Sequence, residues 1–377
     1  MGSIPAGFSN PRSCHTAAML RTAFTELVGC QVPIQQAAMG GATTPELAIA
    51  VSRAGGLGML QHGALTPLAD RITQLEQAQA SPFGVNFLLP FLDRDHPDDV
   101  ELAAGRAQLV EFFYDTPDPD LIGLVHAGGA LAGWQVGSAQ EARQAVDGGC
   151  DLVIAQGTEA GGHVRGSLGL VPLLAEVLEV VQVPVLAAGG ITTGRAMAAV
   201  LGAGAAGVRV GTRLVATAES GAHPDYVAAL VAAGAEATVL TEAYSVGWPD
   251  APHRVLASAV AAAQALSDGP VASLATGSGS ESIPRWFVSP PSREVTGHIE
   301  AMALYAGQGV GQVTEVVPAA QVNNRHGWRI PRTKAAWPAH SWRRAVAGSR
   351  AAAWLAGPSP AMMPTSAEMA RASAAAG

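Results

Sequence analysis

One local pattern recurs along most of this chain: a helix-compatible segment ends in glycines, and an apolar stretch follows at once. The pattern occurs at 54–60 (AGGLGML), 127–137 (AGGALAGWQVG), 147–157 (DGGCDLVIAQG) and 202–211 (GAGAAGVRVG). Short apolar runs bounded by glycine are typical of fully buried strands, which occur in parallel sheets covered by helices. The pattern therefore predicts a repeated β–α unit rather than an all-β sandwich.

Further strands are expected between these segments. They lie at 33–39, 83–89, 109–115 and 183–190, which brings the candidate strands to eight. Helices are expected between them, for example from Thr44 and Pro45 to Arg53, because a capping residue followed by proline is typical of a helix start. Eight alternating units in about 180 residues predict a (β/α)8 TIM barrel, with a doubly wound open sheet as the alternative.

The rest of the chain is expected to add segments to this barrel. We expect an N-terminal arm at 1–21, a barrel formed by 22–213 together with 295–321, and a helical cap over the barrel mouth at 214–294. Residues 294–313 are expected to form two helices around a glycine turn. Residues 322–377 form a tail with four of the seven tryptophans and with eight Lys or Arg residues against one acid, Glu368, so its net charge is +7. We expect this basic tail to be solvated, with an anionic partner as the alternative.

Composition excludes several functional classes. The net charge of −8 disfavours a nucleic-acid surface on the body of the protein. The three cysteines include no CxxC pair, so neither a disulfide framework nor a zinc site is expected, and a reducing cytoplasm fits best. No apolar run approaches the roughly 20 residues of a membrane span, and the first residues lack the apolar core of a signal peptide. The HExxH, GxSxG and P-loop motifs are also absent from the sequence.

Two glycine loops follow neighbouring strands and suit a phosphate. Residues 187–197 (AAGGITTGRAM) and 208–214 (VRVGTRL) each place glycine at a strand end before a helix-compatible stretch. Free backbone N–H groups at such points favour an anion, and TIM barrels commonly bind phosphate after strands 7 and 8. The alternative is that these glycines only let helices pack closely on strands.

Three polar residues lie at predicted strand ends or just after them. Asn86 is polar among apolar neighbours, Gln156 ends its strand, and His163 follows a run of glycines. Two amides at one barrel mouth can hydrogen-bond a planar heterocycle, although each could equally be a satisfied core amide. A histidine in this position can act as a base near neutral pH, but a lone histidine is more often structural. Glu159 is close enough in sequence to orient His163, or is a solvated loop carboxylate.

Seven ordered motifs resemble the nitronate monooxygenase family, formerly the 2-nitropropane dioxygenases, which are FMN-dependent TIM barrels. They are PIQQAAMGG, AGGLGML, FGVNFLL, AQGTEAGGH, VPVLAAGGI, VRVGTRL and YAGQGVG, and they extend over about residues 22–321. The same pattern embraces flavin-dependent enoyl-acyl-carrier-protein reductases and NAD(P)H:quinone reductases. The resemblance therefore implies the fold and the flavin more specifically than the reaction.

The resemblance also implies roles for individual residues. His163 matches the catalytic base. The matching cofactor residues are Met39 and Asn86 lining the flavin, Gln156 and Gly161 holding it, and Gly189, Gly190, Gly211 and Thr212 at its phosphate, with Arg209 and Val210 alongside. Tyr305 and Gln308 match a segment near the substrate pocket. Gly309 stands where several relatives have serine, so substrate hydrogen bonding there is not implied.

These inferences predict FMN-dependent oxidation of alkyl nitronates, and of nitroalkanes, by O2 to a carbonyl compound and nitrite. One alternative is an NAD(P)H-dependent flavin reductase acting on an enoyl thioester or a quinone. Another is a non-catalytic flavin-binding module that recruits a partner through the tail. We expect a small-molecule substrate and O2, no metal, no nucleic acid, no membrane, a cytoplasmic location and a homodimer.

Overall fold

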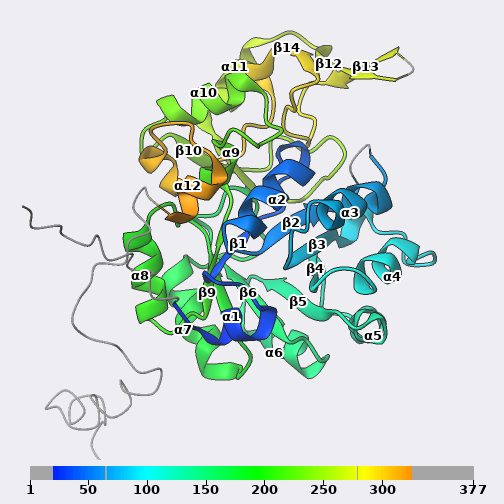
Figure 1. The fold of residues 1–377 in the computed structure, drawn as a ribbon. Coiled ribbons are helices and arrows are strands. Elements are labelled where there is room, and N and C mark those ends of the chain that lie inside the picture. The colour runs from blue at the N-terminus through cyan, green and yellow to red at the C-terminus, as the bar shows by residue number, and fades with distance from the viewer. Residues whose placement is uncertain (1–19, 64–65, 278, 325–377) are drawn as a thin grey trace, which may run out of the picture. The chain divides into compact units, whose positions relative to one another are not determined.

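Eight parallel strands form the centre of the protein. The computed structural model describes residues 20–63, 66–277 and 279–324. The strands are β1 (Ile34–Gln36), β2 (Gly58–Gln61), β3 (Phe83–Leu88), β4 (Leu109–Phe113), β5 (Leu131–Val136), β6 (Leu152–Gln156), β8 (Val185–Ala188) and β9 (Gly207–Val210). They are hydrogen-bonded in the order β1-β9-β8-β6-β5-β4-β3-β2 (Figure 1). The eight predicted strand positions are thereby confirmed.

The seam between β1 and β2 closes this sheet into a barrel. Gln35 and Leu57 form a parallel bridge there. The Gln36 side chain continues the pairing, because its Nε2 donates to the Met59 carbonyl at 3.0 Å and its Oε1 accepts from the Met59 N–H at 3.4 Å. The predicted (β/α)8 barrel is confirmed, and the open-sheet alternative is wrong.

Helices cover the outside of the barrel. They are α2 (Pro45–Arg53), α3 (Leu68–Gln77), α4 (Asp98–Ala104), α5 (Pro119–Gly128), α6 (Ala139–Asp147), α7 (Leu170–Val180) and α8 (Gly194–Gly202). The Thr44 hydroxyl caps α2 by accepting from the Leu47 N–H at 3.1 Å, and Ser138 and Thr193 cap α6 and α8 in the same way. Such caps satisfy N–H groups that have no partner within the helix.

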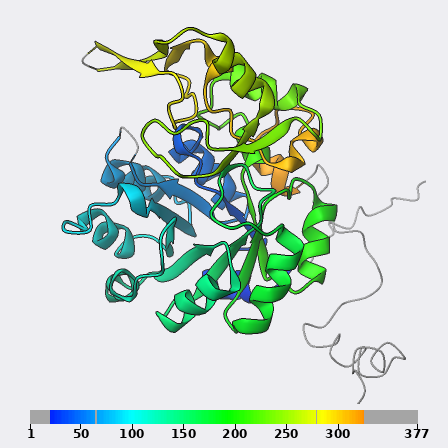
Figure 2. The same ribbon diagram turned by 180° about the vertical axis from the view of Figure 1, so that it is seen from behind.

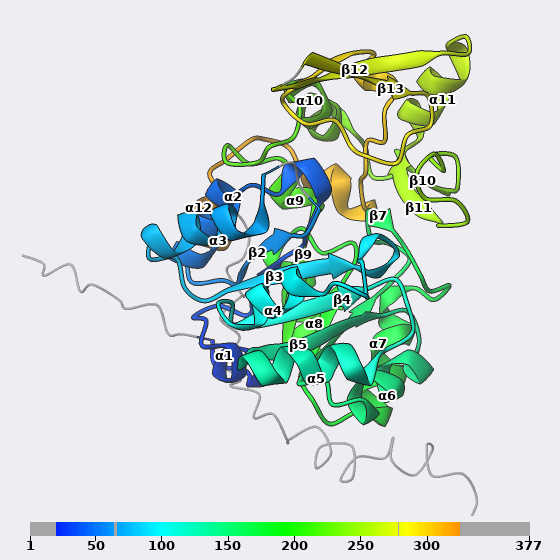
Figure 3. The same ribbon diagram turned by 90° about the vertical axis from the view of Figure 1, so that its right-hand side faces the viewer.

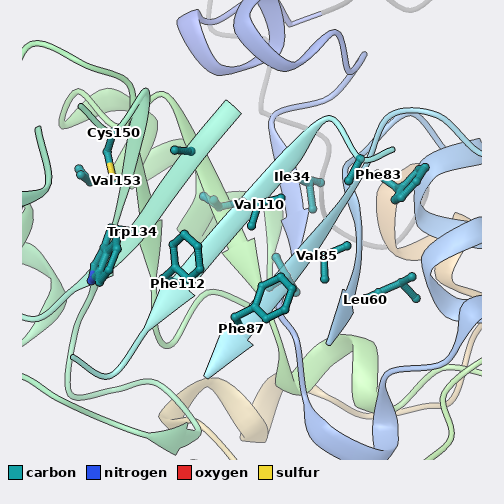
Figure 4. Packing of buried hydrophobic residues seen from close by; sticks show 14 of the residues in the cluster. Ile34, Leu60, Phe83, Val85, Phe87, Val110, Phe112, Trp134, Cys150 and Val153 are labelled. Carbon is teal, nitrogen blue, oxygen red and sulfur yellow. The ribbon is translucent and has the colours of Figure 1, made fainter. Parts of the chain in front are cut away.

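Apolar residues fill two separate layers. One lies between the strands and the outer helices and includes Phe87, Phe112 and Trp134, whose rings pack in a row (Figure 4). The other lies inside the barrel, where Phe24 of α1 (Ala23–Val28) packs with Leu152 and other inward-facing residues of the strands. Helix α1 therefore closes the N-terminal end of the barrel, and ligands must approach the opposite end.

A second group of elements lies over the C-terminal ends of the strands (Figures 2 and 3). Its helices are α9 (Thr212–Val215), α10 (Pro224–Ala232) and α11 (Ala257–Ala265), and its strands are β7 (Gly162–His163), β10 (Thr238–Thr241), β11 (His253–Leu256), β12 (Pro270–Thr276), β13 (Gly279–Pro284) and β14 (Val295–Gly297). Helix α12 (Ala319–Asn324) instead packs on α2 at the outside of the barrel. Short 3₁₀ helices occur at Gly40–Ala42, Leu89–Phe91, Ile299–Ala301 and Gln308–Gln312. Strand β7 joins this group to the barrel, because it follows β6 directly and pairs with β11.

Two expectations about this group are wrong. The segment 214–294 is not purely helical, since it contains β10, β11, β12 and β13 as well as two long helices. The segment 294–313 contains β14 and two 3₁₀ helices rather than two α-helices. The physical reason is that β10, β11 and β14 are short, and that β13 is exposed over most of its length. Such strands do not produce the alternation of apolar side chains that reveals a strand in sequence.

Other expectations lie partly or wholly outside the described residues. The N-terminal arm is described only at its end and the basic tail only as far as Asn324, so the expectation of a solvated tail lies outside the described residues. The boundary expected after Gln321 falls within α12, which packs on α2. Among the described residues, no helix is both long and apolar enough to cross a membrane.

The contact between β2 and α2 gives a test of the packing. A Cβ added to Gly58 would lie 2.1 Å from the Ala48 carbonyl oxygen and 2.6 Å from the Ser52 hydroxyl, whereas one added to Gly123 in α5 meets nothing within 4 Å. We expect Gly58→Ala to lower the free energy of unfolding by about 1–3 kcal/mol or more through overpacking. Gly123→Ala is the control and should raise it by up to about 1 kcal/mol. Urea denaturation measures both, and equal effects would contradict this packing.

Candidate active site

Gln156 and His163 lie where β6 leaves the barrel. Gln156 is the last residue of β6, and its Nε2 donates to the His163 carbonyl at 2.9 Å. This bond fixes the orientation of the amide and directs its Oε1 elsewhere. Oε1 is buried and has no hydrogen-bond partner among the described residues. A buried acceptor without a donor costs free energy, so this atom indicates a place for a ligand.

The His163 ring carries a second unsatisfied atom. Its Nε2 is buried without a partner among the described residues. Aromatic side chains surround the ring: Trp248 stacks on it at 3.9 Å, and His253, Tyr305 and Tyr114 lie at 5.2, 5.5 and 6.0 Å between ring centroids. Burial, with a smaller contribution from His253, lowers the pKa of His163 to about 3. The imidazole is therefore neutral at neutral pH.

His253, by contrast, is fully satisfied. It is completely buried, its Nδ1 pairs with the Ala251 carbonyl at 2.8 Å, and its Nε2 accepts from the Tyr244 N–H at 3.2 Å. These two bonds assign the proton to Nδ1, and burial lowers the pKa of the ring. His253 thus holds the cap together and supports His163 from behind.

A polar network crosses the interior of the barrel beneath this site. Glu111 of β4 is completely buried and pairs with the Arg209 guanidinium of β9. Gln35 donates to the same carboxylate at 2.8 Å and accepts from Arg209 Nε at 3.0 Å, and Gln135 accepts from Arg209 as well. Asn86 Nδ2 donates to the other Glu111 oxygen at 3.0 Å. Both charges are therefore paired and hydrogen-bonded, as buried charges must be.

This network decides which predicted cofactor residues face the mouth with their side chains. The Arg209 side chain lies inside the barrel, and Val210 packs in the apolar layer under the outer helices. Only the backbone atoms of Arg209 and Val210 therefore lie near the mouth at the strand end. The Asn86 side chain is held by its Nδ2 on Glu111, so its amide oxygen Oδ1 is the atom left for a ligand.

The predicted phosphate residues meet at one edge of the mouth. Gly189 and Gly190 follow β8 with φ of 118° and 67°, a conformation that favours glycine, and Gly211 and Thr212 follow the neighbouring β9. Within the described residues, no protein acceptor takes a hydrogen bond from the N–H groups of these four residues. Thr212 Oγ1 accepts from the Gly307 N–H at 3.0 Å, which leaves its own O–H free to donate. These donors suit an anion.

The remaining predicted residues have more varied positions. A Cβ on Gly161 would lie 2.6 Å from the Gly307 nitrogen, so this glycine allows two loops to touch. Met39 borders Gly211, where an added Cβ would lie 3.6 Å from its sulfur. The Tyr305 hydroxyl is engaged, because it donates to the Val288 carbonyl at 2.5 Å, and Gln308 is exposed.

Glu159 does not orient His163. Its carboxylate accepts from the Leu170 N–H at the start of α7, at 2.8 and 3.0 Å. Its carbonyl accepts from the Gln308 N–H at 2.9 Å. The residue therefore fixes the loop between β6 and β7, and the expectation that its carboxylate orients His163 is wrong.

Sequence reasoning missed Tyr114, Trp248 and Glu111. Tyr114 follows β4 with a φ of 77°, which is rare for a bulky residue and occurs preferentially at functional sites. Trp248 comes from the cap, and no local motif marks it. Glu111 is the single acid within the apolar run LVEFF, a pattern that signals a paired charge in a barrel interior. Within the described residues, no group of three or more His, Cys, Asp or Glu side chains could hold a metal.

Comparison with known proteins decides the family. The profile of the nitronate monooxygenase family matches residues 21–325, which is most of the chain. The chain belongs to the nitronate monooxygenase family. Proteins of this family are oxidoreductases, so the chain is an enzyme, and the expectation of a non-catalytic flavin-binding module is wrong.

Individual relatives carry different names. The chain is 38% identical over 239 residues to a 5-hydroxy-7a-methyl-1-oxo-octahydro-1H-indene-4-carboxyl-CoA dehydrogenase of Rhodococcus jostii, an alignment that covers 63% of this chain and 66% of that protein, just under two thirds. It is 30% identical over 267 residues to a probable nitronate monooxygenase of Staphylococcus aureus, covering 59% and 75%.

Solved structures show the same variety. FabK from Thermotoga maritima superposes with a TM-score of 0.64 at 31% identity, covering 80% of this chain and 94% of that chain. The nitroalkane oxidase from Streptomyces ansochromogenes gives 0.60 at 31% identity, covering 80% and 95%.

The interior ion pair gives a test that depends on its burial. Glu111→Leu alone leaves a buried guanidinium without its partner, and we expect it to lower the free energy of unfolding by about 3–5 kcal/mol. The double variant Glu111→Leu/Arg209→Met removes both charges and should recover at least half of this loss. Denaturant titration of both variants measures the difference. Equal stabilities of the single and double variants would contradict the pairing.

Proposed function

We propose that this enzyme binds FMN at the barrel mouth and oxidises alkyl nitronates with O2 to a carbonyl compound and nitrite. The observation that carries the proposal is the pair of buried, unsatisfied atoms Gln156 Oε1 and His163 Nε2 at the same strand end. Membership of the nitronate monooxygenase family supports a flavin as the cofactor. The flavin, when bound, would supply the electron transfer to O2.

The residues at the mouth fit an FMN. Gln156 Oε1 and Asn86 Oδ1 would accept from ring N–H groups, because the nitrogen of each amide already donates to the protein and so orients the oxygen. The unused N–H groups after β8 and β9 would take the phosphate. Gly161 lets the segment with Tyr305 and Gln308 approach the central loop. No part of this fit requires a charged side chain at the mouth.

His163 would hold the substrate at its Nε2. A neutral imidazole can donate from Nε2 to a nitronate oxygen, or accept a proton there from a neutral nitroalkane. A base with a pKa of about 3 is weak at neutral pH, since general-base catalysis is most effective when the pKa is near the working pH. The site therefore favours nitronates, which have already lost this proton, over nitroalkanes.

A second candidate is redox chemistry on a CoA or acyl-carrier thioester with NAD(P)H or another electron carrier. The 38% identity to a carboxyl-CoA dehydrogenase and the superposition with FabK favour it. The same His163 and Gln156 would then face the thioester. The cytoplasmic location and the homodimer stay predictions.

A nitrite assay distinguishes the two candidates. The purified yellow protein should consume O2 and release nitrite with propyl-2-nitronate, and should not be bleached under anaerobic conditions by NADH or NADPH. Extraction of the cofactor followed by chromatography should yield FMN. Rapid bleaching by a pyridine nucleotide without nitrite release would support the thioester candidate instead.

Substitution of His163 tests its role at the substrate. We expect His163→Asn to lower kcat/KM on nitroethane more than on ethyl nitronate, because the nitronate needs no base, but by less than the ~10²–10⁴-fold of a base whose pKa matches the working pH. Gln144→Asn on the exposed side of α6 is the control. Equal losses on both substrates would remove the base role.

The lowered pKa of His163 predicts two pH effects. Activity on a nitronate should show no inflection near about pH 6.5, where an ordinary histidine titrates.

The folded pKa of about 3 lies below that of the unfolded chain, so the unfolded state binds more protons between these values. Stability should therefore fall as the pH is lowered through this window, and His163→Asn should reduce the fall. Thermal unfolding at several pH values measures it.

A further inference from the structure

We propose that Trp248 is the specificity-determining residue of this site: its indole covers one face of His163 and restricts access to Nε2 to carbon acids with small substituents. The inference rests on the proposed function and assigns its substrate class, short-chain alkyl nitronates. It also makes a claim about His163 that can be tested without turnover.

The contacts of Trp248 leave it little freedom. Its ring stacks on His163 with centroids 3.9 Å apart and an interplanar angle of 20°. Tyr114 meets the indole edge-on at 4.5 Å, and Phe91 does so at 5.1 Å. Trp248 is only 7% exposed. The indole is thus held between the loop after β3, the loop after β4 and the His163 ring.

The backbone on either side of Trp248 is also fixed. The Trp248 N–H donates to the Ser245 carbonyl at 3.1 Å, and the two bonds between Val246 and residues 286 and 288 are each 3.0 Å long. Gly247 has a φ of 95°, a conformation that disfavours a side chain there. The indole is therefore presented by a held turn rather than by a loose loop.

The stacked indole covers one face of the imidazole, and Nε2 itself is buried. In the proposed arrangement a substrate reaches Nε2 in the plane of the ring, beside the indole, so a long or branched substituent on the reacting carbon would collide with Trp248. The residues next to the indole that remain open are apolar, since Phe91 is 47% and Val246 41% exposed. These apolar neighbours suit an alkyl rather than a charged substituent, while the indole limits its size.

The same indole excludes water from His163. The other titratable groups that face the imidazole are His253 of β11, Tyr114 after β4 and Tyr305 before the last 3₁₀ helix. Behind them, Glu242 acts on His253 and Tyr114, and Arg165 lies 5.8 Å from the Tyr114 ring. None of these groups is a carboxylate in contact with the imidazole, so desolvation dominates the proton affinity of His163.

Three variants test the size restriction. Trp248→Ala and Trp248→Leu should raise the ratio of kcat/KM on hexyl nitronate to that on ethyl nitronate by about tenfold or more. Trp286→Phe is the matched control, because Trp286 lies in the same cap and packs on Tyr244, away from His163. It should leave the ratio unchanged. Circular dichroism establishes that each variant is folded, and Trp248→Leu retains apolar volume at the position.

A measurement on the resting enzyme tests the shielding independently. With ¹³Cε1-labelled histidine, and His163→Asn for assignment, the His163 signal of the wild type should not titrate between about pH 5 and 8. In Trp248→Ala it should titrate with a midpoint near about 6.5, because water reaches the ring.

The outcomes separate the two proposals. An unchanged ratio or an unshifted His163 titration in folded Trp248→Ala would overturn the role of Trp248. Absence of nitrite release with every nitronate would overturn the proposed function, and the His163 titration would still decide whether Trp248 shields the ring.

Discussion

The buried ion pair between Glu111 and Arg209 is the interaction on which the site depends. The two residues come from β4 and β9, which stand four places apart in the order of the barrel, so the pair crosses the interior. Neither charge is tolerated there alone. Gln35, Asn86 and Gln135 complete their hydrogen bonds and tie in β1, β3 and β5. The layer below is apolar and closed by α1, so this polar layer forms the floor of the barrel mouth.

This floor also determines what the mouth offers to a ligand. A carboxylate can only accept, so Asn86 must donate its Nδ2 to Glu111 and present its oxygen outward. Gln156 likewise donates its Nε2 to the His163 carbonyl, so its Oε1 is the atom presented to a ligand. The mouth therefore combines amide oxygens on one side with unused N–H groups after β8 and β9 on the other. A ligand that matches this mouth has a ring with N–H groups, which donate to the amide oxygens, and an anionic group, which accepts from the unused backbone N–H groups.

Local patterns in the sequence predict the barrel because its strands are short, buried and bounded by glycine. The same patterns point to Gln156, which ends one such strand, and to His163, which follows that strand in the chain. They do not give the direction of the Arg209 side chain, because strands buried on both faces lack the alternation that separates inside from outside. Nor do they bring Trp248 to His163, since 84 intervening residues and a tertiary contact separate the two. The strands of the cap could not be predicted because most are short and β13 is exposed over most of its length.

The state of His163 links the fold to the choice of substrate. The stacked indole and the neighbouring rings keep the imidazole neutral, and its buried Nε2 has no hydrogen-bond partner among the described residues. A ligand therefore selects the tautomer. An anionic nitronate oxygen selects the form with the proton on Nε2 and gains a hydrogen bond in a dry site, where such bonds are strong. A neutral nitroalkane needs the lone pair on Nε2 and then creates an imidazolium that the aromatic surroundings stabilise poorly. The burial that makes His163 a weak base thus makes it a good donor to a nitronate.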